Sequence, residues 1–89
     1  MISDLDKKSI ISVAQKYNVS RVLLFGSSLS DKKEAGDIDL AVEGIEPADF
    51  FSFYGELIFK LSKPVDLVDL SDDSRFHRMV VAEGVPIYG

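Results

Sequence analysis

Hydrophobic and polar residues follow one another along this chain in blocks whose spacing predicts three helices and three to four strands. Residues 4–17 carry apolar side chains at i, i+4 and i+7, which is the spacing of a helix with one buried face. Ser3 or Asp4 is suited to cap the start of this helix, because a short polar side chain there accepts a backbone N–H. Asn18 is suited to end it.

Strands are predicted where apolar residues run without a helical period. A short apolar run at residues 21–25 stops at Gly26, and a second run follows at residues 37–43. Residues 65–70 form the third predicted strand, with side chains alternating between its two faces. Residues 85–88 add a short final strand. The polar residues 30–36 are expected to form a surface loop.

Two further helices are predicted at residues 47–61 and 74–83. Pro47 fits a first helical turn, where its missing N–H costs no hydrogen bond. Residues 72–74 are suited to cap the last helix. The buried stripe of the first of these helices is expected to contain Phe50, Tyr54, Leu57, Ile58 and Leu61, with Phe51 at its margin. Phe53 lies off that stripe and, if exposed, would mark a surface for a partner. In the last helix the residues expected to face inward are Phe76, Met79 and Val80.

This order of elements predicts an α/β (α+β) fold, a small mixed β-sheet of three to four strands with helices packed on it. Eighty-nine residues with 46% hydrophobic content fit one domain over residues 1–89. No apolar stretch approaches the ~20 residues that span a bilayer, and the first residues lack the order of a signal peptide. The absence of cysteine is compatible with a reducing compartment, so we expect a cytoplasmic protein without membrane contact.

The formal net charge of −5 argues against one class of partner. A chain this acidic has no basic surface to grip a phosphate backbone, so stable binding to DNA or RNA is not expected. Acidity does suit a protein that collects divalent cations.

Three carboxylates are candidate metal ligands. Asp37 and Asp39 are two residues apart, so they share one face of the second predicted strand. Asp66 is expected to join them, because its apolar neighbours on the third strand would then face the helices, whereas Asp69 points the opposite way. An Asp-x-Asp alone is more often a pair of solvated charges. Here the flanking apolar residues indicate buried strands, in which carboxylates need partners or a hard cation such as Mg²⁺.

Gly26 and Ser27 form a candidate phosphate site at the end of the first strand. A glycine there allows a sharp turn and a close ligand approach, and the following amides and the Ser27 hydroxyl can donate to an anion. A simple turn, with Ser27 or Ser28 capping a short helix, is the alternative for an isolated Gly-Ser pair.

Taken together, the motifs are far more specific than each alone. Phe-Gly-Ser, nine intervening residues, Asp-Ile-Asp-Leu-Ala-Val and then Val-Asp-Leu-Val resemble the minimal nucleotidyltransferase (MNT) family of the DNA polymerase β-like superfamily. The resemblance extends from Val22 to Tyr88. It implies that Gly26 and Ser27 bind the nucleotide triphosphate.

The same resemblance implies the catalytic and metal-binding set. Asp37, Asp39 and Asp66 would hold two Mg²⁺ ions, and Asp66 would also help to deprotonate an attacking hydroxyl. The implied activity is Mg²⁺-dependent transfer of a nucleoside monophosphate, AMP from ATP, to a hydroxyl acceptor. The resemblance also implies that the acceptor lies on a HEPN-family toxin for which this chain is the antitoxin, and self-association is the other expected contact.

An alternative function is a non-catalytic, antitoxin-like binding subunit that keeps the fold. Family members usually follow Gly-Ser with arginines, whereas this chain has Ser28-Leu29-Ser30-Asp31, which favours that alternative. A third reading is a small acidic α/β domain whose carboxylates bind no metal. His77, the single histidine, is expected on a helix surface rather than as a catalytic base.

Overall fold

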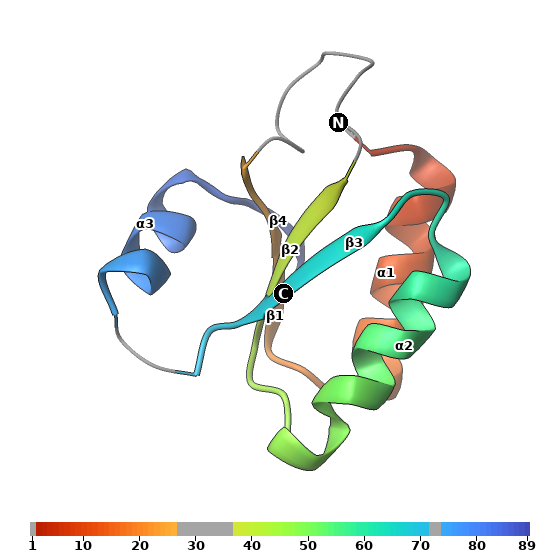
Figure 1. Cartoon of the computed structure of the whole chain (residues 1–89), viewed down its shortest axis with the longest axis horizontal. Helices are drawn as coiled ribbons and strands as arrows, with labels where there is room; N and C mark the ends of the chain where they lie inside the picture. Colours follow the sequence, from red (N-terminus) through yellow and green to blue (C-terminus); the bar gives the residue numbers. More distant parts are fainter. Residues whose placement is uncertain (1, 27–36, 72–73) are drawn as a thin grey trace.

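A four-stranded mixed sheet with helices on both faces forms the computed structural model, in which residues 2–26, 37–71 and 74–89 are described (Figure 1). This arrangement confirms the predicted fold class. The elements in chain order are α1 (Asp4–Lys16), β1 (Arg21–Leu24), β2 (Ile38–Glu43), the 3₁₀ turn η2 (Pro47–Asp49), α2 (Phe50–Lys60), β3 (Val65–Asp69), α3 (Arg75–Glu83) and β4 (Val85–Tyr88). The predicted turn at Ser27 or Ser28, the loop 30–36 and the residues 72–73 lie outside the described part of the chain.

The strands lie in the order β3-β2-β1-β4. β1 pairs antiparallel with both β2 and β4, whereas β2 and β3 are parallel and are joined through α2. Parallel neighbours need a crossover connection, and α2 supplies it. β2, which carries the Asp-x-Asp motif, therefore lies in the interior of the sheet, and β3 lies at an edge of the described sheet.

The two faces of the sheet bury different residues. On one face, α1 and α2 cover alternate residues of the strands, among them Val22, Leu40 and Leu67 (Figure 1). On the other face, α3 packs its buried Val80 against Leu23 and other small or apolar residues. Side chains alternate between the two faces along a strand. The strand residues that alternate with Val22, Leu40 and Leu67 therefore belong to the α3 face, and they include Asp39 and Asp66.

The local helix signals behave as predicted. The Ser3 side chain accepts a hydrogen bond from the Asp6 N–H at 3.1 Å, and the Ser74 side chain accepts one from the His77 N–H at 3.1 Å. Asn18 follows α1 with φ of 55°, the left-handed conformation that ends many helices. Pro47 opens the 3₁₀ turn that leads into α2.

The orientation of α2 about its own axis differs from the prediction. Phe53 is fully buried and its ring meets that of Tyr17 edge-to-face, with centroids 5.7 Å apart, so the expectation that it lies off the buried stripe was wrong. Ile58, expected to be buried, is 55% exposed, and Phe51 is 83% exposed. The helix is apolar on nearly every side, so its own sequence does not determine which side faces the sheet.

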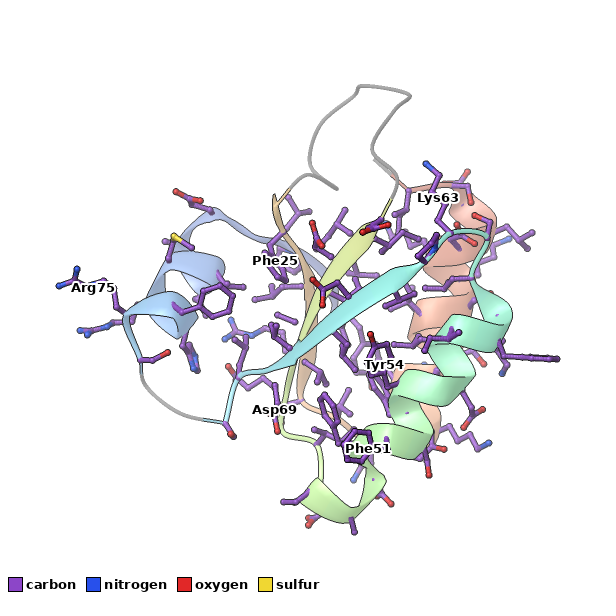
Figure 2. All side chains as sticks on the ribbon, viewed as in Figure 1. Phe25, Phe51, Tyr54, Lys63, Asp69 and Arg75 are labelled. Carbon is purple, nitrogen blue, oxygen red and sulfur yellow. The ribbon has the colours of Figure 1, made fainter. Side chains whose placement is uncertain are left out.

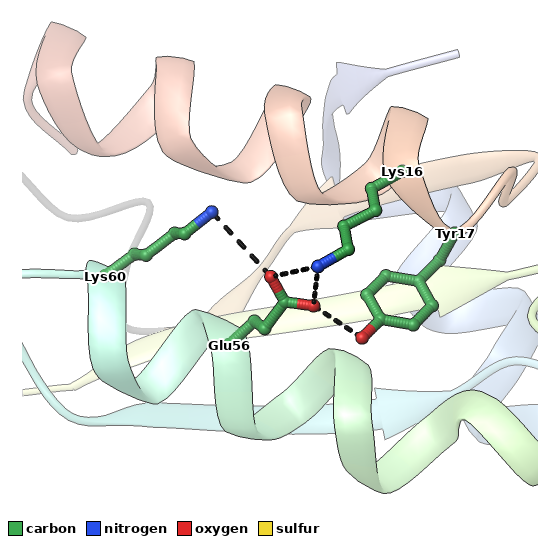
Figure 3. A network of polar contacts seen from close by, with 4 residues as sticks. All are labelled: Lys16, Tyr17, Glu56 and Lys60. Atoms are coloured by element: carbon green, nitrogen blue, oxygen red, sulfur yellow. Dashed lines mark hydrogen bonds and ion pairs between the residues drawn. The ribbon is translucent and has the colours of Figure 1, made fainter.

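A polar network beside α1 fixes that rotation (Figure 3). The Glu56 carboxylate on α2 accepts hydrogen bonds from the Tyr17 hydroxyl and from Lys16 Nζ, and Lys60 Nζ lies 3.7 Å from it. The hydrogen bonds that Tyr17 and Lys16 donate lower the pKa of Glu56 below its ordinary value, and the bond from Tyr17 has the larger effect. With Glu56 held against α1, Phe53 must point into the core.

The last helix is less buried than predicted. Val80 is 1% exposed, as expected, but Phe76 and Met79 are 43% and 48% exposed. With only nine residues, α3 covers a limited part of its face of the sheet.

Candidate functional site

Asp39 and Asp66 are directly opposed on neighbouring strands. In the parallel pairing of β2 with β3, the register sets Asp39 against Asp66. Neighbouring strands are about 4.8 Å apart, and opposed residues point to the same face. The shared face predicted for these two carboxylates is thus confirmed, and Asp66 is exposed while Asp39 is half-buried.

Gly26 lies against the Asp39 carboxylate. The Phe25 N–H donates to the Asp39 carbonyl oxygen at 3.0 Å, which extends the β1–β2 pairing to the residue before Gly26. Gly26 then turns with φ of +63°, and a Cβ placed on it would lie 2.7 Å from Asp39 Oδ2. The chain therefore keeps room beside this carboxylate through the lack of a side chain at residue 26.

The structure says less about the other two predicted site residues, Asp37 and Ser27. Asp37 is exposed and comes immediately before β2, while Ser27 lies outside the described residues. Within residues 2–26, 37–71 and 74–89, no group of three or more His, Cys, Asp or Glu side chains is arranged to hold a metal ion. The structure brings Asp39 and Asp66 together. Metal binding by Asp37, Asp39 and Asp66 stays a prediction.

The donor set nevertheless fits a hard divalent cation. Carboxylate oxygens are the ligands that Mg²⁺ prefers, and Asp39 and Asp66 offer them from adjacent strands. The space that a Cβ at Gly26 would occupy lies directly beside one of these oxygens. A metal ion is small enough to use such a space.

Two aromatic rings flank the site on its α3 side. Phe25, which is labelled in Figure 2, comes directly before Gly26. Its ring meets that of Phe76 of α3 edge-to-face, with ring centroids 6.0 Å apart. The pairing ties the start of the Gly26 turn to α3. Sequence spacing does not connect these residues, because only the fold brings positions 25 and 76 together.

The single histidine takes part in a different cluster. Arg21 Nη2 lies 2.6 Å from Glu43 Oε2, and His77 Nε2 lies 3.7 Å from the same oxygen. Arg21 and Glu43 are paired residues at the end of the β1–β2 ladder opposite to Gly26. His77 thus links α3 to the end of the β1–β2 ladder that is opposite to Gly26. That it has no catalytic role stays a prediction.

None of the helices in the described part of the chain has the length and apolar character needed to span a membrane.

Comparison with known proteins identifies the type of domain. The sequence profile of the family described as polymerase beta nucleotidyltransferase matches residues 8–89. No curated protein sequence matches the chain significantly.

Three solved structures show the same fold. A chain from a crystal structure of a toxin–antitoxin with AMP-PNP is 28% identical, with a TM-score of 0.75, over 96% of this chain and 74% of that one. A chain from the complex of a tri-AMPylated Shewanella oneidensis HEPN toxin with an MNT antitoxin is 26% identical, with a TM-score of 0.74, over 99% and 73%. A chain from the toxin–antitoxin MntA-HepT is 26% identical, with a TM-score of 0.72, over 98% and 73%.

Proposed function

Because this chain belongs to the polymerase β family of nucleotidyltransferases, we propose that it transfers AMP from ATP to a hydroxyl group on a partner protein. The observation that carries the proposal is the opposed pair Asp39 and Asp66, with Gly26 making room beside Asp39. In such a transfer the acceptor oxygen bonds to the α-phosphorus. The bond from that phosphorus to the bridging oxygen of the β-phosphate breaks, and pyrophosphate leaves with the bonding electrons.

Each site residue has a role in this proposal. Gly26 and Ser27 receive the triphosphate, because backbone amides at a tight turn donate to phosphate oxygens. Asp39 and Asp37 would hold the nucleotide-bound cation. Asp66 is the exposed member of the opposed pair, so it is the carboxylate that an acceptor hydroxyl can reach, and it takes the hydroxyl proton and passes it to solvent.

Two Mg²⁺ ions held by Asp37, Asp39 and Asp66 would supply charge stabilisation to the attacking and leaving oxygens. The protein's own contribution is then the fixed spacing of its carboxylates. Asp39 and Asp66 come from paired strands in a sheet, and such elements hold side chains more rigidly than loops do.

The complexes with the same fold support a particular acceptor. They are toxin–antitoxin assemblies, one of them with AMP-PNP and another with a tri-AMPylated HEPN toxin. We therefore assign to this chain the role of the antitoxin, with a HEPN-type toxin as its partner and a hydroxyl side chain of that toxin as acceptor.

The test is an adenylyl-transfer assay on the complex of this protein with its co-purified partner. Mass spectrometry of the partner, after incubation with ATP and Mg²⁺, should reveal one or more added adenylyl groups. Asp39→Asn and Asp66→Asn should each reduce transfer by about 100-fold or more. The control is Asp69→Asn. Asp69 lies on β3 with Asp66 but on the opposite face of that strand, so this variant should retain transfer.

The outcome also decides between enzyme and binding subunit. A partner that binds this chain tightly but gains no adenylyl group, with no effect of Asp39→Asn on binding, would overturn the enzymatic proposal. The non-catalytic antitoxin would then be the function, in line with Ser28-Leu29-Ser30-Asp31 standing where the family usually has arginines.

A further inference from the structure

The helix α3, which packs on the face of the sheet that carries Asp39 and Asp66, exposes two large apolar side chains (Figure 1). Phe76 is 43% exposed and Met79 is 48% exposed. They are three residues apart, so they share one flank of the helix, next to the buried Val80. We call Phe76 and Met79 the α3 pair.

The α3 pair lies on the flank of α3 that faces the Gly26 end of the sheet. The ring of Phe76 meets that of Phe25, the residue directly before Gly26, with centroids 6.0 Å apart. His77, one residue later, contacts the opposite end, since its Nε2 lies 3.7 Å from Glu43 Oε2. Successive residues of a helix are about 100° apart, so the two flanks of α3 face the two ends of the sheet.

Phe25 connects the α3 pair to the opposed aspartates. Its N–H donates to the Asp39 carbonyl oxygen at 3.0 Å, and Asp39 is paired with Asp66 on the next strand. Phe25, Asp39 and Asp66 therefore form one row across neighbouring strands, and residues in such a row point to the same face. Along this row, Asp39 has an aromatic side chain on one side and a carboxylate on the other.

A nucleoside triphosphate matches this layout. Its phosphates bind cations and backbone amides, and the candidates for those contacts lie at Asp39 and Gly26. Its base is a flat ring system, separated from the α-phosphate by a single ribose. Aromatic side chains bind bases by stacking, and methionine adapts to the irregular space beside a ring. With its phosphates at Asp39, the nucleotide can place its base only a short way along the row, on the aromatic side.

We propose that the α3 pair is the base-binding side of the site, with Phe76 stacked on the base and Met79 against its edge. The inference rests on the proposed function for the position of the phosphates. It concerns binding and not the chemical step, because neither side chain contacts the reacting atoms. Every base has a π face, so the α3 pair supplies affinity for a nucleotide and little choice among bases.

Isothermal titration calorimetry of the purified protein, in the presence of Mg²⁺, tests the proposal with two probes. One is α,β-methylene ATP, in which the bond that transfer would break is replaced. The other is ribose 5-triphosphate, which has the sugar and the phosphates but no base. The wild type should bind the nucleotide about tenfold more tightly than the probe without a base. Phe76→Ser should remove about tenfold of affinity for the nucleotide and leave the other probe unchanged.

Three variants serve as controls for that result. Phe59→Ser is the matched control, because Phe59 is 89% exposed on α2, on the other face of the sheet, and both probes should bind this variant as they bind the wild type. Phe76→Tyr keeps an aromatic ring and should keep the affinity for the nucleotide. Met79→Ser should weaken nucleotide binding severalfold, without loss of the contact between Phe76 and Phe25. Urea denaturation verifies that each variant is folded.

Two results would overturn the base-binding side. One is a wild type that binds both probes equally. The other is a preference for the nucleotide that neither Phe76→Ser nor Met79→Ser weakens. If Phe76→Ser lowers only the transfer to the partner and leaves nucleotide binding unchanged, the α3 pair contacts the acceptor and the proposal is wrong.

Failure of the proposed function gives a different pattern. Nucleotide binding that is weakened in Phe76→Ser, together with no adenylyl group on the partner, would support the base-binding side and overturn only the enzymatic proposal. A wild type that binds neither probe would overturn both.

Discussion

Gly26 and the Asp39 carboxylate lie so close together that no side chain fits between them. A Cβ on Gly26 would come within 2.7 Å of Asp39 Oδ2, and the φ of Gly26 is +63°, a conformation that other residues adopt at a cost. Glycine is therefore required here for two independent reasons, the backbone conformation and the space beside the carboxylate.

Gly26→Ala should accordingly lower both stability and activity. The strained φ alone predicts a loss of about 1–2 kcal/mol in the free energy of unfolding. The new methyl group should also displace the Asp39 carboxylate, so adenylyl transfer per folded molecule should fall further than stability explains. Urea denaturation and the transfer assay measure the two effects separately.

Gly44→Ala is the control for this variant. Gly44 has a φ of +82° and lies just after β2, at the other end of the strand from Asp39, where its Cβ would meet Ser20. It should lose stability but keep its rate of transfer per folded molecule. Equal rates in both variants would contradict a role for Gly26 at the site.

The stability of the protein should depend on pH through Glu56. Hydrogen bonds from Tyr17 and Lys16 hold the folded pKa of Glu56 below its ordinary value of 4.5. A lowered folded pKa contributes stability above pH 4.5, and this contribution is lost as the pH falls from 4.5 through the folded value. Tyr17→Phe removes the largest cause of the shift, so its urea midpoint should change less steeply with acid than that of the wild type.

Tyr54→Phe provides the comparison for Tyr17→Phe. The Tyr54 hydroxyl donates to the Val65 carbonyl oxygen at 2.8 Å, which is not a titrating group. Loss of this hydrogen bond in Tyr54→Phe should lower the urea midpoint by a similar amount at every acid pH. Parallel acid profiles for wild type and Tyr17→Phe would show that the Glu56 network does not act in this way.

Two neighbouring phenylalanines of α2 should respond very differently to truncation. Phe53 is fully buried, so Phe53→Ala should cost about 3–5 kcal/mol of unfolding free energy. Phe51 is 83% exposed, so Phe51→Ala should change it by about 0.5 kcal/mol or less. Denaturation in dilute solution, where association does not contribute, measures both. If Phe51→Ala instead cost more unfolding free energy than Phe53→Ala, α2 would be rotated so that Phe51, and not Phe53, faces the core.

The buried carboxylate of Asp6 should be a stability determinant. It is 4% exposed and accepts hydrogen bonds from the Ser62 N–H at 3.2 Å and the Ser62 hydroxyl at 2.5 Å. Asp6→Ala leaves both donors without this acceptor and should cost about 1–3 kcal/mol, as measured by urea denaturation. Ser62→Ala removes only the hydroxyl and should cost less. A larger loss for Ser62→Ala would point to a different acceptor for Ser62.

Sequence spacing predicted correctly that Asp39 and Asp66 share a face, because strand geometry is local. Side chains alternate with a period of two, so Asp66 had to share a face with Val68 and Leu70 once the strand was recognised. Spacing could not provide the register that sets Asp39 against Asp66, since the pairing of two parallel strands depends on how α2 packs between them. The contact between Gly26 and Asp39 depends in the same way on the β1–β2 pairing.

The positions of the helices and strands, their caps and the faces of the strands were therefore determined by the sequence itself. These features follow from short-range effects, such as the Ser3 and Ser74 caps and the alternation along β3. The rotation of α2 was decided only by the tertiary structure. Its sequence is apolar on nearly every side, and the contact of Glu56 with Lys16 and Tyr17 selects the side that is buried. That choice places Phe53 in the core and leaves Phe51 and Phe59 on the surface, because a rigid helix can bury only one side against the sheet.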